Sequence, residues 1–403
     1  MISTALLGFG IVGSGTAEVL TRNQALIESR IGDSFRIRYI LDLREFPDSP
    51  FAPLIVHDFN TILNDPEISV VAEMMGGSHP AYDFTKALLM AGKSVVTSNK
   101  EVVANFGTEL LQIARENGVH YLFEASVGGG IPIISPLRKD FSSNRITAIS
   151  GILNGTTNYI LTRMKNEGAA FDDVLRDAQR LGYAERNPVA DVEGLDAARK
   201  TVILAAMAFG KRLDPNAIHC EGITNVTPED CAYAESAGYA IKLIGHTSLT
   251  DGRVVAMVSP RAVRADNPIY GVNDVFNGIL VEADMVGKVM FYGPGAGKLP
   301  TASAVAADMI EIMSGRTVDP AEWTDAGTDD IADFDGYVCR SLLTFDVPEE
   351  QAAGLRALFG ASDWFETLNG KHTFVTEPMS EAETLARIAS AGFPLVSRVR
   401  VLD

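Results

Sequence analysis

Short apolar runs alternate with segments of helical periodicity over the first 140 residues. Several of these runs end in glycine or small polar residues, where a strand gives way to a helix. Strands that alternate with helices are typical of a parallel, doubly wound sheet, in which ligands bind at the carboxyl ends of the strands. The pattern therefore predicts an α/β fold. The strands expected are residues 3–7, 35–41, 69–75, 94–97 and 119–123.

The first apolar run leads into Gly8-Phe9-Gly10-Ile11-Val12-Gly13 and then into a helical stretch. In this order Gly8 permits a tight turn, Gly10 lets the backbone approach a pyrophosphate, and Gly13 lets the helix pack closely on the strand. The helix N-terminus would then bind the anion. A glycine turn that serves only the backbone is the alternative. In this context the motif predicts a Rossmann-type nucleotide-binding domain over residues 1–140.

The residues that follow the later strands bear on the cofactor. Asp42 ends the second strand and could bind a ribose, whereas Arg44 could meet a 2′-phosphate, so NAD and NADP both stay open. Plain surface roles for both residues are an equal alternative. The loops after the next strands supply further cofactor candidates, which are Gly76, Gly77, Ser98 and Lys100.

Three consecutive glycines occur in the stretch Glu124–Ile134. Such a run leaves backbone amides and carbonyls uncovered, which suits either a closely approaching ligand or a hard cation held by carbonyl oxygens. A flexible loop is the other interpretation. Farther on, a strand over 145–153 enters the polar segment Asn154–Asn158, which is expected to cap a helix that reaches about Glu167.

The segment Gly182–Lys200 carries the most informative spacing. Asp196 and Lys200 are four residues apart on one helical face, and the same stripe continues through the apolar Ile203 and Met207. The pair is therefore expected to face a buried side, although a solvated salt bridge is the usual explanation of such spacing. An ammonium that protonates a developing alkoxide, with carboxylates that bind a substrate amino group, suits carbonyl reduction by hydride.

Composition narrows the class of protein. The chain has 403 residues, 46% of them hydrophobic and 21% charged, enough for two or three domains, and no apolar run is long enough to cross a membrane. A net charge of −18 argues against a nucleic-acid partner. The N-terminus shows no signal-peptide pattern, so a cytoplasmic location is expected. Cys220, Cys231 and Cys339 lack metal-type spacing and are expected to be reduced and inert.

Five separated stretches of the chain together resemble the homoserine dehydrogenase family, and in particular its monofunctional members. The first is shared by many dinucleotide-binding proteins, whereas those beginning at Glu124 and Gly182 are highly specific. They cover the chain to about residue 315. The five are Gly8–Gly13, Val95–Lys100, Glu124–Ile134, Gly182–Lys200, and Gly293–Gly297 with Pro300–Ala302.

The resemblance implies roles for individual residues. Lys200 resembles the proton donor of the family, and Lys100 the second active-site lysine beside the nicotinamide. Glu185 and Asp196 resemble the residues that hold homoserine, with Asp191 supporting them. Phe9, Gly10, Ile11, Val12 and Gly13 match the phosphate loop of the family, and Gly182 and Gly297 match later loops that close over the cofactor. Glu124, Val127, Gly129 and Ile131 match the positions whose backbone oxygens hold a monovalent cation, usually sodium, in the family.

The resemblance also implies the domain plan and the activity. Residues 141–315 are expected to form an α/β substrate-binding and dimerisation region, with 293–315 returning to the nucleotide domain, in a homodimer or a dimer of dimers. The expected reaction is reversible hydride transfer between L-homoserine and L-aspartate 4-semialdehyde, with NAD or NADP, in threonine and methionine biosynthesis. The alternative is a catalytically inactive, nucleotide-sensing regulatory protein of the same fold, which would not consume the cofactor.

The tail over residues 334–403 has a pattern of its own. Strand-like runs at 337–343 and 372–375 surround helices at 349–358 and 380–391, an order that resembles a small α+β ACT regulatory domain. Members of that group commonly place glycine at the first strand-to-helix turn, where this chain has Glu349. We expect Glu349 to cost the turn positive-φ freedom and to repel an effector carboxylate. The tail is therefore expected to bind threonine weakly or not at all; a plain scaffold domain is the alternative.

Overall fold

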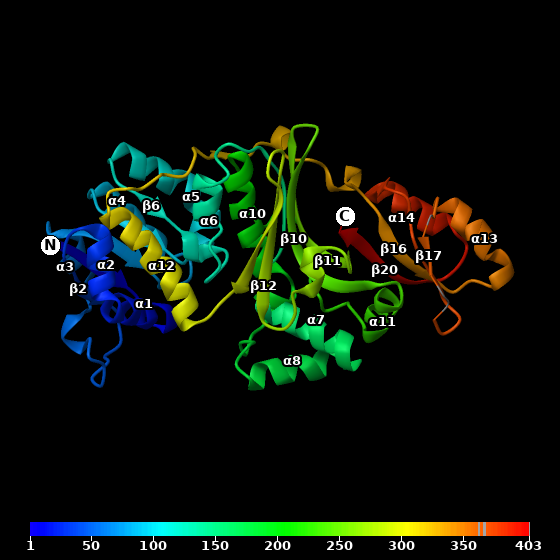
Figure 1. The fold of residues 1–403 in the computed structure, drawn as a ribbon, viewed down its shortest axis with the longest axis horizontal. Coiled ribbons are helices and arrows are strands. Elements are labelled where there is room, and N and C mark those ends of the chain that lie inside the picture. The colour runs from blue at the N-terminus through cyan, green and yellow to red at the C-terminus, as the bar shows by residue number, and fades with distance from the viewer. Residues whose placement is uncertain (362, 366–367, 403) are drawn as a thin grey trace. The chain divides into compact units, whose positions relative to one another are not determined.

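The computed structural model describes residues 1–361, 363–365 and 368–402 (Figure 1). The chain folds into two compact units, each assembled from separated segments. The first unit comprises residues 1–146, 202–215 and 293–326. The second comprises residues 147–201, 216–292 and 327–403.

A parallel sheet forms the centre of the first unit, in the order β3-β2-β1-β4-β5-β6. In the register of the sheet Leu7 faces Leu41 on one side and Glu73 on the other, so the carboxyl ends of β1, β2 and β4 lie at one edge. Strands β2 and β3 follow β1 toward one side of the sheet, whereas β4, β5 and β6 continue toward the other side. The order of the strands therefore reverses between β1 and β4, and ligands bind at this switch point in such folds. The expected Rossmann-type sheet is confirmed. Its strands are β1 (Ile2–Leu7), β2 (Phe35–Leu41), β3 (Ile55–Val56), β4 (Ile68–Glu73), β5 (Ser94–Thr97) and β6 (Tyr121–Leu122).

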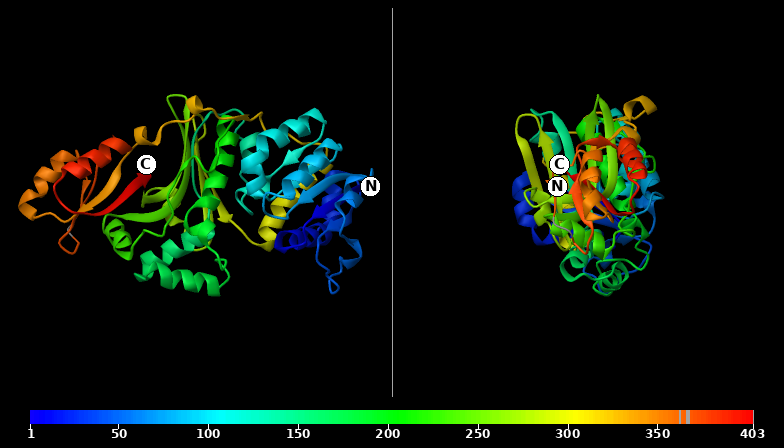
Figure 2. Two further views of the ribbon diagram at one scale, coloured as in Figure 1. Left: turned by 180° about the vertical axis from the view of Figure 1, so that it is seen from behind. Right: turned by 90° about the vertical axis from the view of Figure 1, so that its right-hand side faces the viewer.

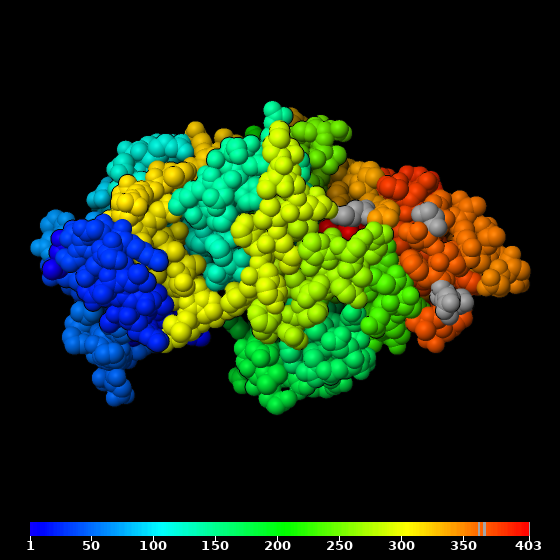
Figure 3. Space-filling view, viewed as in Figure 1, coloured from blue at the N-terminus to red at the C-terminus, as the bar shows by residue number. Residues whose placement is uncertain are grey.

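Helices from distant parts of the sequence cover this sheet. Helix α12 (Lys298–Met313) packs along α1 (Ile11–Arg22), and the two lie side by side in Figures 1 and 3. Their apolar faces share one core, in which Leu20, Val305 and Met309 are fully buried. Burial of these side chains fixes the late segment to the nucleotide unit. The other helices are α2 (Gln24–Ile31), α3 (Phe59–Leu63), α4 (Ala81–Met90), α5 (Lys100–Glu116) and α6 (Ile134–Lys139), and a small pair of strands joins β8 (Lys211–Arg212) to β14 (Thr324–Asp325).

The second unit is built on a large mixed sheet, ordered β13-β12-β7-β10-β11-β20-β16-β18-β17 with β9 beside β11. The long hairpin of β10 (Tyr239–Thr250) and β11 (Arg253–Arg264) runs in continuous register through its middle. The neighbouring strands are β7 (Ile146–Ile152), β9 (His219–Cys220), β12 (Phe276–Ala283) and β13 (Gly287–Pro294). The helices are α7 (Gly155–Glu167), α8 (Phe171–Arg180), α9 (Val189–Val192), α11 (Pro228–Ser236) and α10 (Leu195–Phe209), which continues into the first unit.

The tail shows the expected βαββαβ order of its main elements, together with the short strands β15 (Val338–Cys339) and β19 (Met379–Ser380). Its sheet joins the larger one, because β20 pairs in parallel with β11 and antiparallel with β16 (Figures 1 and 2). This junction pairs segments far apart in sequence, which local periodicity does not reveal. The main elements are β16 (Ser341–Phe345), α13 (Glu349–Leu358), β17 (Asp363–Trp364), β18 (His372–Val375), α14 (Glu381–Ser390) and β20 (Leu395–Leu402).

One expectation for the tail is wrong. Glu349 is the first residue of helix α13, so the turn before it needs no positive φ at this position. Among the described non-glycine residues only Asp251, Asp274 and Asn369 have positive φ. Loss of positive-φ freedom therefore plays no part at Glu349. In the part of the chain that is described, no helix is both long enough and apolar enough to cross a membrane.

Candidate functional site

The glycines of the first loop have the geometry that a phosphate site needs. Gly8 has φ +90°, and a Cβ on Gly13 would lie 2.0 Å from the carbonyl oxygen of Gly8. A Cβ on Gly10, in contrast, would meet no atom within 4 Å. Helix α1 begins at Ile11, and no side chain caps its N-terminus. The amides of its first turn are therefore left for an anion, on the open side of the loop.

Beside this loop lies a cavity of about 470 Å³ at the carboxyl ends of β1, β2 and β4. Its walls are mostly apolar, as in sites that enclose a cofactor. The cavity is therefore the natural place for a nucleotide held by the glycine loop. It is lined by Gly8, Gly10, Leu41, Asp42, Leu43, Arg44, His57, Phe59, Met74, Met75, Gly76, Pro80 and Phe84.

Asp42 and Arg44 form an ion pair in the wall of this cavity. The Nε and Nη2 atoms of Arg44 lie 3.0 and 2.9 Å from the two carboxylate oxygens of Asp42. The amide of Phe9 donates to the same carboxylate at 2.8 Å, which ties it to the glycine loop. The hydrogen bonds from Arg44, against a desolvation cost, lower the pKa of Asp42 to about 2. Both groups that bear on the choice between NAD and NADP thus lie at one place.

The loops after β4 and β5 meet at the same edge of the sheet. Gly76 and Gly77 both have positive φ, +79° and +71°. The side chain of Asn99 donates to the carbonyl oxygen of Gly77 at 2.8 Å and caps helix α5, whose first residue is Lys100. Ser98 precedes this cap and donates its amide to the carbonyl oxygen of Glu73 at 3.3 Å. The structure therefore brings together the candidates that follow these two strands.

The glycine run after β6 is buried and closely packed. Gly129 has φ +58°, and a Cβ there would lie 2.2 Å from the carbonyl oxygen of Gly295. A Cβ on Gly128 would lie 2.3 Å from the carbonyl oxygen of Ile131. Within the described chain, the backbone oxygens of Val127, Gly129 and Ile131 accept none of the hydrogen bonds found. Buried carbonyl oxygens that lack a donor are ligands of the kind that a hard cation takes.

Two buried carboxylates hold this loop by hydrogen bonds to its backbone, and the sequence motifs predicted neither of these roles. The carboxylate of Glu124 accepts hydrogen bonds from the amides of Ile133, Ile134 and Ser135 at 2.6 to 2.9 Å. The amide of Glu124 donates to Asp308 of helix α12 at 2.8 Å. Burial raises the pKa of both carboxyl groups. The only signal in the sequence is an acidic residue, Asp308, on the apolar stripe of its helix.

Asp196 and Lys200 form the buried pair that their spacing predicts. The two residues are 5% and 9% exposed, and the ammonium of Lys200 donates to Asp196 at 2.7 Å. A second bond, at 2.8 Å, runs to the carbonyl oxygen of Leu153 at the end of the strand segment before α7. The alternative of a solvated salt bridge is therefore wrong for this pair.

Asn154 joins the carboxylates into one cluster, a role that the sequence did not reveal. Its side-chain amide donates to Asp191 at 2.7 Å and to Asp196 at 3.0 Å. Its side-chain oxygen accepts from the amide of Thr157 and caps helix α7. The polar capping pattern of this segment was the available signal. Asp191, Asp196 and Lys200 are consequently part of one hydrogen-bonded network around Asn154.

The other candidates belong to other segments of the chain. Glu185 is exposed in the segment between α8 and α9, and among the described residues its side chain forms no hydrogen bond or ion pair. Gly182 has φ +79°, in the same segment. Gly297 has φ +127° and caps helix α12 in the first unit. The structure therefore groups Asp191, Asp196 and Lys200, but does not join Glu185 to them.

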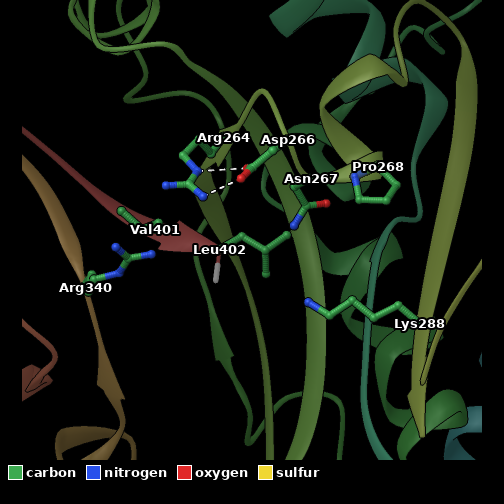
Figure 4. A pocket seen from close by; sticks show the side chains of 8 residues that line it. All are labelled: Arg264, Asp266, Asn267, Pro268, Lys288, Arg340, Val401 and Leu402. Carbon is green, nitrogen blue, oxygen red and sulfur yellow. Dashed lines mark hydrogen bonds and ion pairs between the residues drawn. The ribbon is translucent and has the colours of Figure 1, made fainter.

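A second cavity, of about 240 Å³, contains none of the expected site residues (Figure 4). Three basic side chains line it, and carboxylates lie close to Arg264 and Lys288. Arg264 pairs with Asp266, and Lys288 lies 3.2 Å from Glu282. The positive charges of Arg264 and Lys288 are therefore balanced by these two carboxylates. Its lining is Arg264, Asp266, Asn267, Pro268, Lys288, Arg340, Val401 and Leu402.

The three thiols are unsuited to nucleophilic catalysis, as expected. None of them forms a disulfide. Burial raises the pKa of Cys220 to about 11 and that of Cys231 to about 12, and it also raises the pKa of Cys339. Since the thiolate is the reactive form, aldehyde oxidation through a thiohemiacetal has no candidate here.

Comparison with known proteins agrees with this geometry. Family models described as "Homoserine dehydrogenase, NAD binding domain" and "Homoserine dehydrogenase" match residues 8–124 and 132–310. The homoserine dehydrogenase of Synechocystis sp. is 45% identical over 77% of this chain and 73% of its own length. That of Corynebacterium glutamicum is 39% identical over 89% of this chain and 83% of its own length.

Solved structures extend the likeness along the whole chain. A homoserine dehydrogenase from Thiobacillus denitrificans superposes with a TM-score of 0.89 at 36% identity, covering 100% of this chain and 98% of that one. A hyperthermophilic archaeal homoserine dehydrogenase, solved in complex with NADPH, gives a TM-score of 0.68 at 26% identity over 79% of this chain and 99% of that one. The chain belongs to the homoserine dehydrogenase family of NAD(P)-dependent oxidoreductases.

Proposed function

We propose that this chain performs the reaction of its family with Lys200 as proton donor and with Asp191 and Asp196 as the site for the amino group of L-homoserine. The observation that carries these roles is the buried contact of 2.7 Å between Lys200 and Asp196, which Asn154 extends to Asp191. Buried charges are costly unless they are paired or used, so a cluster of this kind indicates a functional site.

The cluster supplies each group that reduction of L-aspartate 4-semialdehyde needs beside the hydride. When it is bound, the nicotinamide cofactor supplies or accepts that hydride. The ammonium of Lys200 gives a proton to the developing alkoxide, and in the reverse direction the amine takes the hydroxyl proton of homoserine. The carbonyl oxygen of Leu153 and the carboxylate of Asp196 fix the direction of its N–H bonds.

The two aspartates suit the ammonium group that substrate and product share. Both accept from the single side-chain nitrogen of Asn154, at 2.7 and 3.0 Å, so their separation is set before substrate binds. Charge-assisted hydrogen bonds to an ammonium are roughly twice as strong as neutral ones. Glu185 as a third substrate ligand and Lys100 as the second active-site lysine are supported by the family resemblance.

For the cofactor we propose the glycine loop Phe9–Gly13 as the pyrophosphate site, with the 470 Å³ cavity beside it for the nucleotide. The uncapped first turn of α1 supports this assignment. Asp42 offers a carboxylate to a ribose 2′-hydroxyl, and Arg44 offers a guanidinium to a 2′-phosphate. The remaining proposed neighbours are Gly76, Gly77, Ser98, Lys100, Gly182 and Gly297.

We also propose a structural monovalent cation, sodium, in the loop Glu124–Ile131. The carbonyl oxygens of Val127, Gly129 and Ile131 fit the role because no donor reaches them within the described chain. The carbonyl oxygen of Glu124 is the fourth ligand that the family resemblance supplies. The buried carboxylates of Glu124 and Asp308 hold both ends of the loop in place.

A homodimer or dimer of dimers in the cytoplasm completes the proposal. The family resemblance supports the oligomer, as do the apolar side chains of Met285, Val286 and Tyr292, which are exposed on the hairpin of β12 and β13. The three unpaired thiols fit a reducing compartment. Light scattering at assay concentrations measures the oligomeric state.

The direct test is a spectrophotometric assay of the purified chain. We expect it to reduce NADP⁺ or NAD⁺ with L-homoserine and to oxidise the reduced cofactor with L-aspartate 4-semialdehyde. L-serine, one methylene shorter, serves as the substrate control. The same assays and a thermal melt, run with sodium or with choline as the only cation, test the cation site; we expect sodium to raise the melting temperature. A chain that binds the cofactor but turns over neither substrate would be the regulatory protein instead.

Threonine is expected to inhibit weakly or not at all. Glu349 and Glu350 occupy the first turn of α13, where their negative charge opposes an effector carboxylate. The measurement is L-threonine titration in the homoserine assay, with calorimetry in parallel. Strong inhibition at millimolar threonine, abolished by a point change in the tail, would contradict the prediction. A point change is preferable to truncation, because β20 belongs to the main sheet.

A further inference from the structure

Arg400, in the last strand β20, joins the tail to a segment near the substrate cluster. Its guanidinium donates to both carboxylate oxygens of Glu381 in α14, at 2.8 and 3.0 Å. On its other side it donates to Glu221 at 2.7 Å. The side chain of Arg400 is only 8% exposed and that of Glu381 3%, so the bonds between these two are protected from water. A buried guanidinium fork of this kind holds its partners in a fixed geometry.

Glu221 begins a segment that supports helix α9. Its amide donates to the carbonyl oxygen of Val258 at 2.8 Å, and that of Ile223 donates to the carbonyl oxygen of Val192 at 2.8 Å. Between them, a Cβ on Gly222 would lie 2.2 Å from the oxygen of Val192. The backbones are thus in direct contact, and there is no room between them to absorb a shift.

Helix α9 carries Asp191 directly before Val192. Asp191 accepts from Asn154, which also holds Asp196. A displacement of residues 221–223 would therefore move one of the two carboxylates proposed to hold the amino group. Errors of about 1 Å in such a site cost up to roughly a hundredfold in rate.

The link from Arg400 to Glu221 is more than the tail itself requires. Within the tail, Glu381 already receives two bonds from Arg400 and one from Arg398 at 2.6 Å. Glu221, in contrast, is 40% exposed and lies outside the tail. It receives a further bond from His219 at 2.7 Å. Removal of its charge should consequently leave the packing of the tail intact.

We propose that Arg400 and Glu221 are positioning residues for the homoserine site, acting through residues 221–223 on Asp191. The inference rests on the proposed function, in which Asp191 and Asp196 bind the amino group. It makes the docked tail part of the basal active site, independent of any effector. The cofactor loop belongs to the other unit, so the cofactor should not be affected.

The test is the Glu221→Gln variant in the full chain. We expect the KM for L-homoserine to rise about tenfold, the KM for the cofactor to stay within about twofold, and the melting temperature to change little. Arg400→Lys should raise the same KM, because a lysine cannot bridge two carboxylates as the guanidinium fork does. The matched control is Glu377→Gln, which breaks a tail pair at 3.0 Å with Arg387 and touches none of residues 219–223.

The outcomes separate this inference from the proposed function. If Glu221→Gln and Asp191→Asn both raise the KM for homoserine and the double variant is no worse than Asp191→Asn, the inference is supported. If Asp191→Asn raises it and Glu221→Gln does not, the inference is overturned and the proposed function stands. If neither does, the proposed role of Asp191 itself is wrong. Equal increases in both KM values with a large fall in melting temperature would mean a purely structural pair, and would also overturn the inference.

Discussion

Replacement of Lys200 by alanine is expected to lower turnover by at least about a hundredfold, or ~2.7 kcal/mol in barrier height, with little change in cofactor affinity. Lys200 is the buried ammonium of the cluster, held by Asp196 at 2.7 Å and by the carbonyl oxygen of Leu153 at 2.8 Å. Alanine removes the proton donor that Asp196 and the carbonyl oxygen of Leu153 hold in place. Steady-state kinetics with homoserine, together with cofactor titration by fluorescence, measure both effects.

Lys288→Ala provides the control for this experiment. Lys288 is also paired with a carboxylate, Glu282 at 3.2 Å, but it is half exposed and belongs to neither the proposed substrate site nor the proposed cofactor site. Its loss should leave turnover nearly unchanged. If Lys200→Ala retained more than half of the wild-type rate, the assignment of the proton donor would be wrong.

The second large effect is expected from Asp196→Asn. This change removes a charge that pairs both with Lys200 and, in the proposal, with the amino group of the substrate. Loss of a charge-assisted hydrogen bond costs about 1.5–3 kcal/mol, so the KM for homoserine should rise at least about tenfold while that for the cofactor changes much less. Glu185→Gln should shift the same constant in the same direction, if its assignment from the family resemblance is right.

Comparison with Asp191→Asn shows how much of the effect of Asp196→Asn on turnover arises from the disturbance of Lys200. Asp191 accepts a hydrogen bond from Asn154 at 2.7 Å, whereas Asp196 accepts one directly from Lys200, also at 2.7 Å. Asp191→Asn should therefore raise the KM for homoserine with a smaller fall in turnover than Asp196→Asn. Equal increases in the KM for homoserine and the KM for the cofactor would indicate a collapsed site instead, and would contradict the substrate assignment.

Sequence spacing was sufficient wherever the relevant contact lies within one element or one turn. The four-residue separation of Asp196 and Lys200 places them on one helical face whatever surrounds the helix, and the apolar stripe that follows predicted the buried side. Likewise, the order of glycines from Gly8 to Gly13 follows from the sterics of a single turn. Helix α13 begins and ends at the expected residues, Glu349 and Leu358, for the same reason.

The tertiary structure alone decided the contacts between distant segments. Asn154 meets Asp191 and Asp196 across 37 and 42 residues, Asp308 holds the amide of Glu124 across 184, and Arg400 reaches Glu221 across 179. No local periodicity records such pairs, because they depend on which strands and helices pack together and in what register. By itself the sequence thus determined the α/β class, the glycine loop and the lysine–aspartate pair. Packing decided how the carboxylates are joined, what braces the glycine-rich loop, and that strand β20 of the tail extends the sheet beside the substrate cluster.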